Sequence, residues 1–174
     1  AEGPYWLSFN VGDSRVYVVG GGGIRQLTHD HSALQEARDL AATSGAPRLI
    51  PPANVVTKAL GAGQAGSVKA DYTIMPQEEG DRAVICTDGV HGVLRDSQIH
   101  AVVAAGDGPQ GTADALVRAS LESGTRDNTT AVVVYAGTKS RVTLTSNVMN
   151  RMIQPVRLAS IETARRVPRR EGSN

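Results

Sequence analysis

The chain has 174 residues, of which 40% are hydrophobic, 20% charged and 3% aromatic, a composition typical of one soluble globular domain with a short appendage. Its single cysteine, Cys86, excludes an internal disulfide framework, and no apolar run approaches the ~20 residues that a membrane span needs. The net charge of +1 is unevenly placed, since residues 1–137 carry 10 Lys and Arg against 15 Asp and Glu, whereas residues 138–174 carry 8 against 2.

Alternation and β-branched residues predict strands over the following ranges: 6–10, 15–19, 24–27, 55–60, 68–75, 82–87 and 129–135. Helical spacing predicts a helix over 32–44, with Ser32 and Gln35 as a capping box. Further helices are predicted over 96–105 and from Pro109 to Gly124, the latter with Ala115, Leu116, Ala119 and Leu121 on its inner side. Because turns join most of the strands, we expect an α+β fold with antiparallel sheets and helices on a face.

The uneven charge separates an acidic domain, residues 1–137, from a basic tail or linker, residues 138–174, which we expect to be partly helical near 145–153. The acidic domain disfavours nucleic-acid binding and suits a site for divalent cations. The tail has no aromatic residues between its arginines, so a solvated linker is favoured over binding to nucleic acid or a membrane. No signal peptide is visible, and we expect a cytoplasmic monomer.

Three acidic residues stand beside glycines or at the ends of predicted strands. Asp88 directly follows a buried strand, Asp127 precedes another, and Asp13 lies in a glycine turn. A carboxylate at the mouth of a strand is rigidly placed near solvent, as a Mg²⁺ or Mn²⁺ ligand must be. For any one of them, ordinary turn formation is the alternative. We expect Gly89 to allow a sharp turn beside Asp88, and Cys86 to be a buried, inert thiol.

Five segments occur together in one order, namely 10–15 (NVGDSR), 27–32 (LTHDHS), 57–61 (TKALG), 87–90 (TDGV) and 126–130 (RDNTT). In that order and spacing the sequence resembles the PP2C family of metal-dependent serine/threonine protein phosphatases, also called the PPM family. The resemblance covers about residues 6–136. It implies an α+β fold, a β-sandwich of antiparallel sheets flanked by helices, of which this chain is the C-terminal part and the N-terminal part is missing.

The resemblance also implies a function and a site. The family hydrolyses phosphoserine and phosphothreonine in proteins with a water activated by two Mn²⁺ or Mg²⁺ ions. By its pattern Asp88 and Asp127 are metal ligands, Asp13 belongs to a looser third metal, and Gly89 and Asn128 support them. Arg15 and the segment 30–32 are structural. The implied partners are phosphoprotein substrates and the serine/threonine kinases whose action the enzyme reverses, in a bacterial signalling system.

Two departures from the family pattern affect the site. The family's upstream acidic motifs and phosphate-binding arginine are not found, so we expect this polypeptide alone to be inactive or nearly so, and its exposed sheet faces to favour aggregation. Gly92 stands where many members have an aspartate, which puts the third metal in doubt. The neighbouring His91 either replaces that ligand or is an exposed loop histidine. The alternative function is a non-catalytic, phosphatase-like regulatory or scaffolding module that binds phosphoproteins or kinases.

Overall fold

The structure is a computed structural model, and it describes residues 4–44, 50–52, 54–62, 68–137 and 162–163. Its elements, in chain order, are β1 (Tyr5–Asn10), β2 (Arg15–Gly20), β3 (Gly23–Gln26), α1 (Ala33–Ser44), β4 (Asp71–Pro76), β5 (Arg82–Cys86), α2 (Asp88–His91), α3 (Asp96–Ala105), α4 (Pro109–Glu122), β6 (Ala131–Tyr135) and β7 (Glu162–Thr163). Within the described ranges, none of the helices has the length and apolar content needed to span a bilayer.

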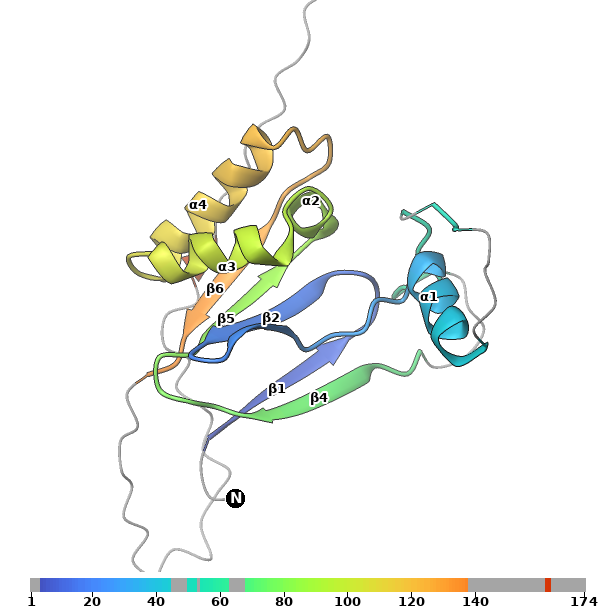
Figure 1. Ribbon diagram of the computed structural model, residues 1–174, viewed down its shortest axis with the longest axis horizontal. Helices are drawn as coiled ribbons and strands as arrows, with labels where there is room; N and C mark the ends of the chain where they lie inside the picture. Colours follow the sequence, from blue (N-terminus) through green and yellow to red (C-terminus); the bar gives the residue numbers. More distant parts are fainter. Residues whose placement is uncertain (1–3, 45–49, 53, 63–67, 138–161, 164–174) are drawn as a thin grey trace, which may run out of the picture.

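Two antiparallel sheets form the described body. The larger has the strand order β3-β2-β5-β6-β7, and the smaller consists of β1 and β4. Figure 1 shows α3 and α4 over one face of the larger sheet and the β1–β4 pair on its other side. The expected α+β architecture of antiparallel sheets with helices is confirmed.

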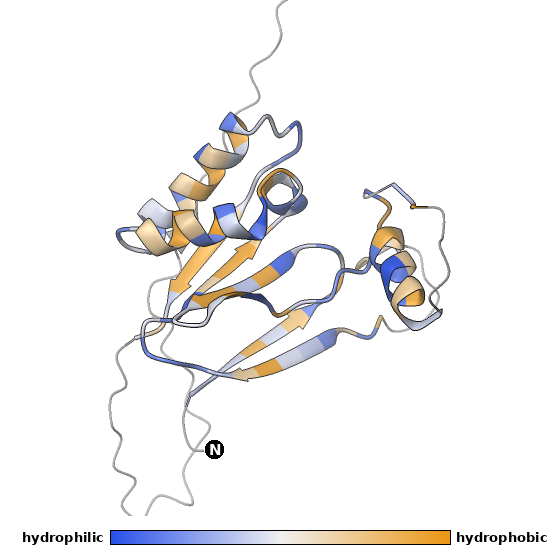
Figure 2. Ribbon diagram, viewed as in Figure 1, coloured by the Kyte–Doolittle hydropathy of each residue, from blue (hydrophilic) through white to orange (hydrophobic). Residues whose placement is uncertain are grey.

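Both faces of the larger sheet carry a cluster of buried apolar side chains, because successive residues of its strands point to opposite faces, although Ile85 of β5 stays 44% exposed. Tyr17, Val84 and Val133 point toward the helices and pack with Ile99 and Leu116. On the opposite face, a second cluster consists of Val18, Leu27 and Ala83, with Trp6 of β1 and Met75 of β4 packed against it. Figure 2 shows the resulting hydrophobic residues along β5 and β6, beneath α3 and α4.

Helix α1 lies apart from this core, beside one end of the sheets (Figure 1), and none of its residues is buried. The expected cap is half formed: the backbone N–H of Gln35 donates to the Ser32 hydroxyl at 3.2 Å. The Gln35 side chain bonds to Asp39 at 2.9 Å instead of returning to the cap. Contacts at Ala33 with the Val55 carbonyl and at Asp39 with His29 tie the helix to the neighbouring loops.

Two expectations about elements are wrong in detail, and one short element was missed. Residues 55–60 form no strand; a single bridge joins Val56 to Ser32. The short helix α2 was not predicted at all. In α4 the buried residues are Thr112, Ala113, Leu116, Val117 and Ser120, whereas Leu121 is 46% exposed. The predicted helix near 145–153 lies outside the described residues, and the division of the chain at residue 137 stays a prediction.

Candidate functional site

The ends of two neighbouring strands bring the segments of Asp88 and Asp127 together. Because β5 and β6 are antiparallel, with Cys86 opposite Ala131, the end of β5 and the start of β6 share one edge of the sheet. Beyond that pair, the backbone N–H of Thr87 donates to the carbonyl of Thr130, and the N–H of Thr130 to the Thr87 hydroxyl, both at 3.2 Å. These bonds hold the two loops against one another.

Gly89 fits this contact because it has no side chain. A Cβ at residue 89 would lie 2.4 Å from the carbonyl oxygen of Asn128 and 2.9 Å from the hydroxyl oxygen of Thr129. Gly89 belongs to α2 and is not among the glycines with positive φ. The chain does turn here, from β5 directly into α2, but the turn needs no left-handed backbone at Gly89. Close approach of two backbones is what the position requires.

Asp13 lies in the turn between β1 and β2, and two histidines hold that turn. The N–H of Gly12, at φ 119°, donates to Nδ1 of His31 at 2.9 Å. Nε2 of His91 donates to the carbonyl oxygen of Asp13 at 3.0 Å. His91 is half-buried as the last residue of α2. The expectation of an exposed loop histidine is wrong, and the ring nitrogen is committed to the Asp13 backbone.

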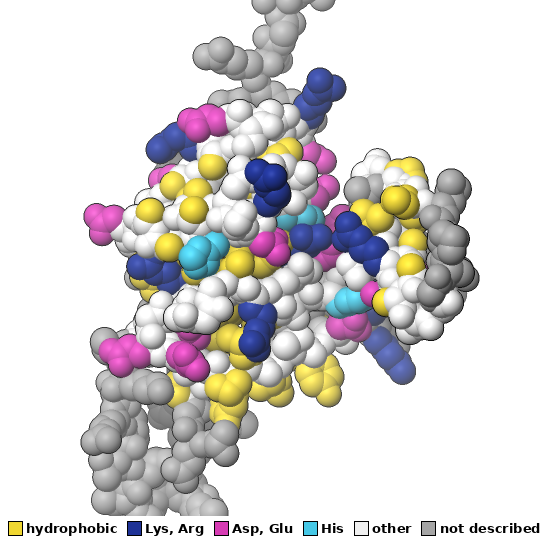
Figure 3. Space-filling model, in the orientation of Figure 1, with side chains coloured by type: hydrophobic (Ala, Val, Ile, Leu, Met, Phe, Trp, Pro, Cys, Tyr) yellow, Lys and Arg dark blue, Asp and Glu magenta, His cyan; other side chains and the backbone are white. Residues whose placement is uncertain are grey.

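A pocket of about 380 Å³ lies where this turn meets α2 and the first turns of α1. Its lining includes Asp13, Arg15, Asp30, Arg38, Asp88 and His91. The structure thus brings Asp13 and Asp88 to one pocket. Figure 3 shows basic, acidic and histidine side chains gathered between the main body and the α1 region.

Arg15 is held firmly at the edge of this pocket. Its Nε and one terminal nitrogen donate to the Asp30 carboxylate, at 3.0 and 2.7 Å, and the other terminal nitrogen donates to the Tyr17 hydroxyl at 2.9 Å. Only 18% of the Arg15 side chain and 7% of the Asp30 side chain are exposed. A fork-shaped ion pair of this kind fixes both groups in orientation. Each of the three guanidinium nitrogens of Arg15 therefore has a partner within the fold.

Asp127 is exposed on its loop, and its Oδ1 accepts a hydrogen bond from the N–H of Asn128 at 2.6 Å. Asn128 acts through its backbone as well, because its carbonyl accepts from the Thr87 hydroxyl at 3.2 Å. Among the residues that the structure describes, no three His, Cys, Asp or Glu side chains form a group that could hold a metal ion. A metal site shared by Asp13, Asp88 and Asp127 therefore stays a prediction.

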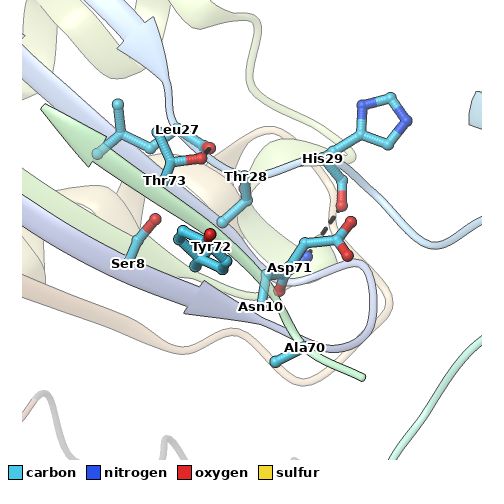
Figure 4. A pocket seen from close by; sticks show the side chains of 9 residues that line it. All are labelled: Ser8, Asn10, Leu27, Thr28, His29, Ala70, Asp71, Tyr72 and Thr73. Carbon is cyan, nitrogen blue, oxygen red and sulfur yellow. Dashed lines mark hydrogen bonds between the residues drawn. The ribbon is translucent and has the colours of Figure 1, made fainter. Parts of the chain in front are cut away.

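A second pocket, also of about 380 Å³, lies between the start of β4, the end of β1 and the segment after β3. Figure 4 shows its lining, with the His29 ring pointing away from the pocket; its Nε2 bonds to the Asp39 carboxylate of α1 at 2.8 Å. The Thr73 hydroxyl donates to the carbonyl of Leu27 at 2.8 Å, and Asn10 donates to the carbonyl of His29 at 3.0 Å. These polar groups support the loop that leads to α1, and the pocket lacks the Asp88 and Asp127 segments.

Burial alters the acidity of two groups near the site. It raises the pKa of the Cys86 thiol to about 12, so the thiol stays protonated and unreactive, as expected. Burial, followed by the positive charge of Arg15, lowers the pKa of His91. The hydrogen bond to the Asp13 carbonyl acts in the opposite direction and raises the pKa of His91. Sequence reasoning missed this contact because 78 residues separate its partners and no local pattern records such a pairing.

Comparisons with known proteins relate the chain to the PP2C-type serine/threonine phosphatases. No model of a protein family matches the chain. Its sequence, however, is 31% identical over 135 residues to "Protein phosphatase 2C homolog 1" of Saccharomyces cerevisiae, covering 72% of this chain and 48% of that protein.

Two solved structures are similar in fold. The PPM Ser-Thr phosphatase MsPP from Mycobacterium smegmatis, in complex with cacodylate, is 32% identical with a TM-score of 0.63, covering 75% of this chain and 56% of that one. The catalytic domain of the phosphatase PstP, in complex with two manganese ions, is 26% identical with a TM-score of 0.59, covering 76% and 54%. The chain spans about half the length of the curated relatives it matches.

Proposed function

We propose that the protein to which this chain belongs is a metal-dependent phosphatase of phosphoserine and phosphothreonine in proteins. The observation that carries the proposal is the similarity in sequence and fold to such phosphatases over about three quarters of the chain. The adjacency of the loops that carry Asp88 and Asp127 supports it. Its substrates would be phosphoproteins made by serine/threonine kinases, and a cytoplasmic, monomeric state stays a prediction.

The carboxylates offer the oxygen donors that Mn²⁺ and Mg²⁺ prefer. Asp88 and Asp127 would be ligands of a two-metal centre, and Asp13 would belong to a third, weaker position. When bound, two such ions supply an acidified water and positive charge for the phosphoryl oxygens. The protein's own task is to hold the carboxylates still, which Gly89 does by close packing and Asn128 by its backbone bonds to Thr87 and Asp127.

The described residues supply only part of such a centre. Asp13 and Asp88 line one pocket, but within the described ranges no group of three metal-ligating side chains is present. Two or three carboxylates offset too little of the charge of two dications to hold both. We therefore propose that the 174-residue chain is inactive or nearly so by itself, and that hydrolysis requires the complete natural polypeptide.

The test is manganese-dependent hydrolysis of a phosphothreonine peptide by the complete natural polypeptide, by the 174-residue chain, and by the complete polypeptide with Asp88→Asn. The matched control is Asp114→Asn, the same change on exposed residue 114 of α4. We expect activity in the complete protein and in the control, and a loss of at least about 100-fold with Asp88→Asn.

A complete polypeptide that binds phosphopeptides but never hydrolyses them, with Mn²⁺ or Mg²⁺, would contradict the proposal. That result would favour a non-catalytic, phosphatase-like module that binds phosphoproteins or kinases. This second function is supported by one observation: the described residues contain no group of three metal-ligating side chains, which a catalytic metal centre would need.

A further inference from the structure

Arg38 lies in the second turn of α1 and faces the pocket that contains Asp13 and Asp88. Leu34, one helical turn earlier, lines the same pocket, so this side of the helix is turned toward it. The start of α1 is fixed to the site: the backbone N–H of His31 donates to the carbonyl of Gly12, and that of Ala33 to the carbonyl of Val55, each at 2.9 Å. Arg38 of α1 therefore lines the same pocket as the candidate ligands Asp13 and Asp88.

The two arginines of the pocket differ in what they can still bind. Arg15 is largely buried and bonded to Asp30 and Tyr17. Arg38 is exposed, and over the described ranges it forms no hydrogen bond or ion pair with the protein. An arginine without a protein partner keeps its full set of donors for an incoming ligand. Of the two, Arg38 is the one available to an anion.

The charges of the pocket define which ligand suits this arginine. Arg15 compensates Asp30, and Asp13 of the β1–β2 turn and Asp88 of α2 line the same pocket as Arg38. A phosphate monoester has oxygens on several sides of one phosphorus. It can meet metal-loaded carboxylates on one side and a forked guanidinium on the other.

Resting on the proposed function, we propose that Arg38 of α1 binds the phosphate group of the phosphoserine or phosphothreonine substrate in this pocket. Arg38 acts as a substrate-binding residue that steers and holds the phosphoryl group. Sequence reasoning missed it, and the only local signal is its position four residues after Leu34 on a helix that directly follows the 27–32 segment. Removing it should weaken substrate binding more than turnover.

The experiment measures binding of a fluorescent peptide that carries a non-hydrolysable phosphonate analogue of phosphoserine to the complete natural polypeptide with Mn²⁺. The matched peptide carries serine. Variants are Arg38→Gln, which removes the charge, Arg38→Lys, which keeps it without the fork, and Arg118→Gln, an exposed arginine of α4 as control. We expect Kd to rise about tenfold for Arg38→Gln, less for Arg38→Lys and less than twofold for Arg118→Gln.

Two results would overturn the inference: equal Kd values for Arg38→Gln and Arg118→Gln, or no preference of the unsubstituted protein for the phosphonate peptide over the serine peptide. Steady-state hydrolysis gives a second reading, in which Arg38→Gln raises KM more than it lowers kcat. If hydrolysis is absent but phosphonate binding depends on Arg38, the proposed function fails and the inference about Arg38 stands. If hydrolysis proceeds and Arg38→Gln changes neither phosphonate binding nor KM, the proposed function stands and the inference about Arg38 fails.

Discussion

Gly89 is the residue at which the geometry of the site is most sensitive to one added carbon. Alanine there would place Cβ 2.4 Å from the Asn128 carbonyl oxygen, so one of the two loops must move. We expect Gly89→Ala to lower the free energy of unfolding by about 1–3 kcal/mol, measured by urea denaturation.

The control for that change is Gly111→Ala in α4, where nothing lies within 4 Å of an added Cβ. Alanine in a helix interior is favoured over glycine by about 0.5–1 kcal/mol, so this variant should be as stable as the original or more so. Equal losses at both positions would contradict the close-packing role of Gly89.

Cys86 makes a pH-dependent contribution to the free energy of unfolding. Burial raises the pKa of its thiol from 9.0 to about 12, so the folded state keeps the proton to higher pH than the unfolded chain does. The stabilisation is complete below about pH 9 and is lost as the pH rises toward 12. Tyr17, whose pKa burial raises to about 12, adds to the loss in the same direction.

We therefore expect the chain to be less stable to urea at pH 10.5 than at pH 8. We also expect Cys86 to react with a thiol reagent such as DTNB at pH 8 only slowly while folded, and rapidly in urea. Fast reaction of the folded chain, at the rate seen in urea, would show that the thiol is not buried.

One face of helix α4 packs against the larger sheet and stabilises the fold, and the opposite face lies in solvent. Leu116 is fully buried against the larger sheet, whereas Leu121 is 46% exposed. Leu116→Ala should cost about 2–5 kcal/mol of unfolding free energy, and Leu121→Ala should stay within about 0.5 kcal/mol. Urea denaturation of the two variants decides this, and similar costs would mean that the helix is rotated relative to the described packing.

The sequence predicted most strands and helices because their signals are local. The runs before Asp88 and after Asp127 are short, β-branched and bounded by turn residues, and both are strands. Residues 55–60 have the same β-branched character. A strand, however, requires several consecutive residues paired with a neighbouring strand, and among the described residues of this segment only Val56 forms a bridge, to Ser32. Pairing of β1 with β4 joins residues more than 60 positions apart, which no local pattern records.

The same contrast holds for the site. The sequence was enough to predict Asp13, Asp88 and Asp127 as metal ligands. Each stands beside a predicted strand end or turn, and the order of the surrounding motifs matches the family pattern. The contact of His91 with Asp13, the reason for Gly89 and the placement of Arg38 depend on how distant segments pack. In α4, Leu121 was expected inside because hydrophobicity alone was weighed. The structure buries Thr112 and Ser120 instead, which bond to backbone carbonyls one turn earlier.

At the scale of the whole molecule, the outer face of the β1–β4 pair is unusually apolar. Leu7, Phe9, Tyr72 and Ile74 are 54–69% exposed, and they are cross-strand partners on one side of the pair. Figure 3 shows hydrophobic side chains protruding along the lower edge of the body. Contiguous apolar surface of this kind favours association.

We expect the 174-residue chain to self-associate and to bind the dye ANS, and the double change Phe9→Ser with Ile74→Thr to reduce both. Sedimentation velocity and ANS fluorescence measure these effects. The control is Leu121→Ser, an isolated exposed leucine on α4. If the double variant associates as strongly as the control, the β1–β4 face is not the surface responsible.

Mn²⁺ binding by the complete natural polypeptide tests whether Asp88 and Asp127 share a metal centre, and electron paramagnetic resonance follows it as the signal of free Mn²⁺ disappears. Asp88→Asn and Asp127→Asn are compared with Asp114→Asn. We predict that each of the first two changes weakens or removes tightly bound Mn²⁺ while the third leaves it intact. Unchanged stoichiometry and affinity in both the Asp88 and Asp127 variants would contradict a shared metal centre at the adjoining ends of β5 and β6.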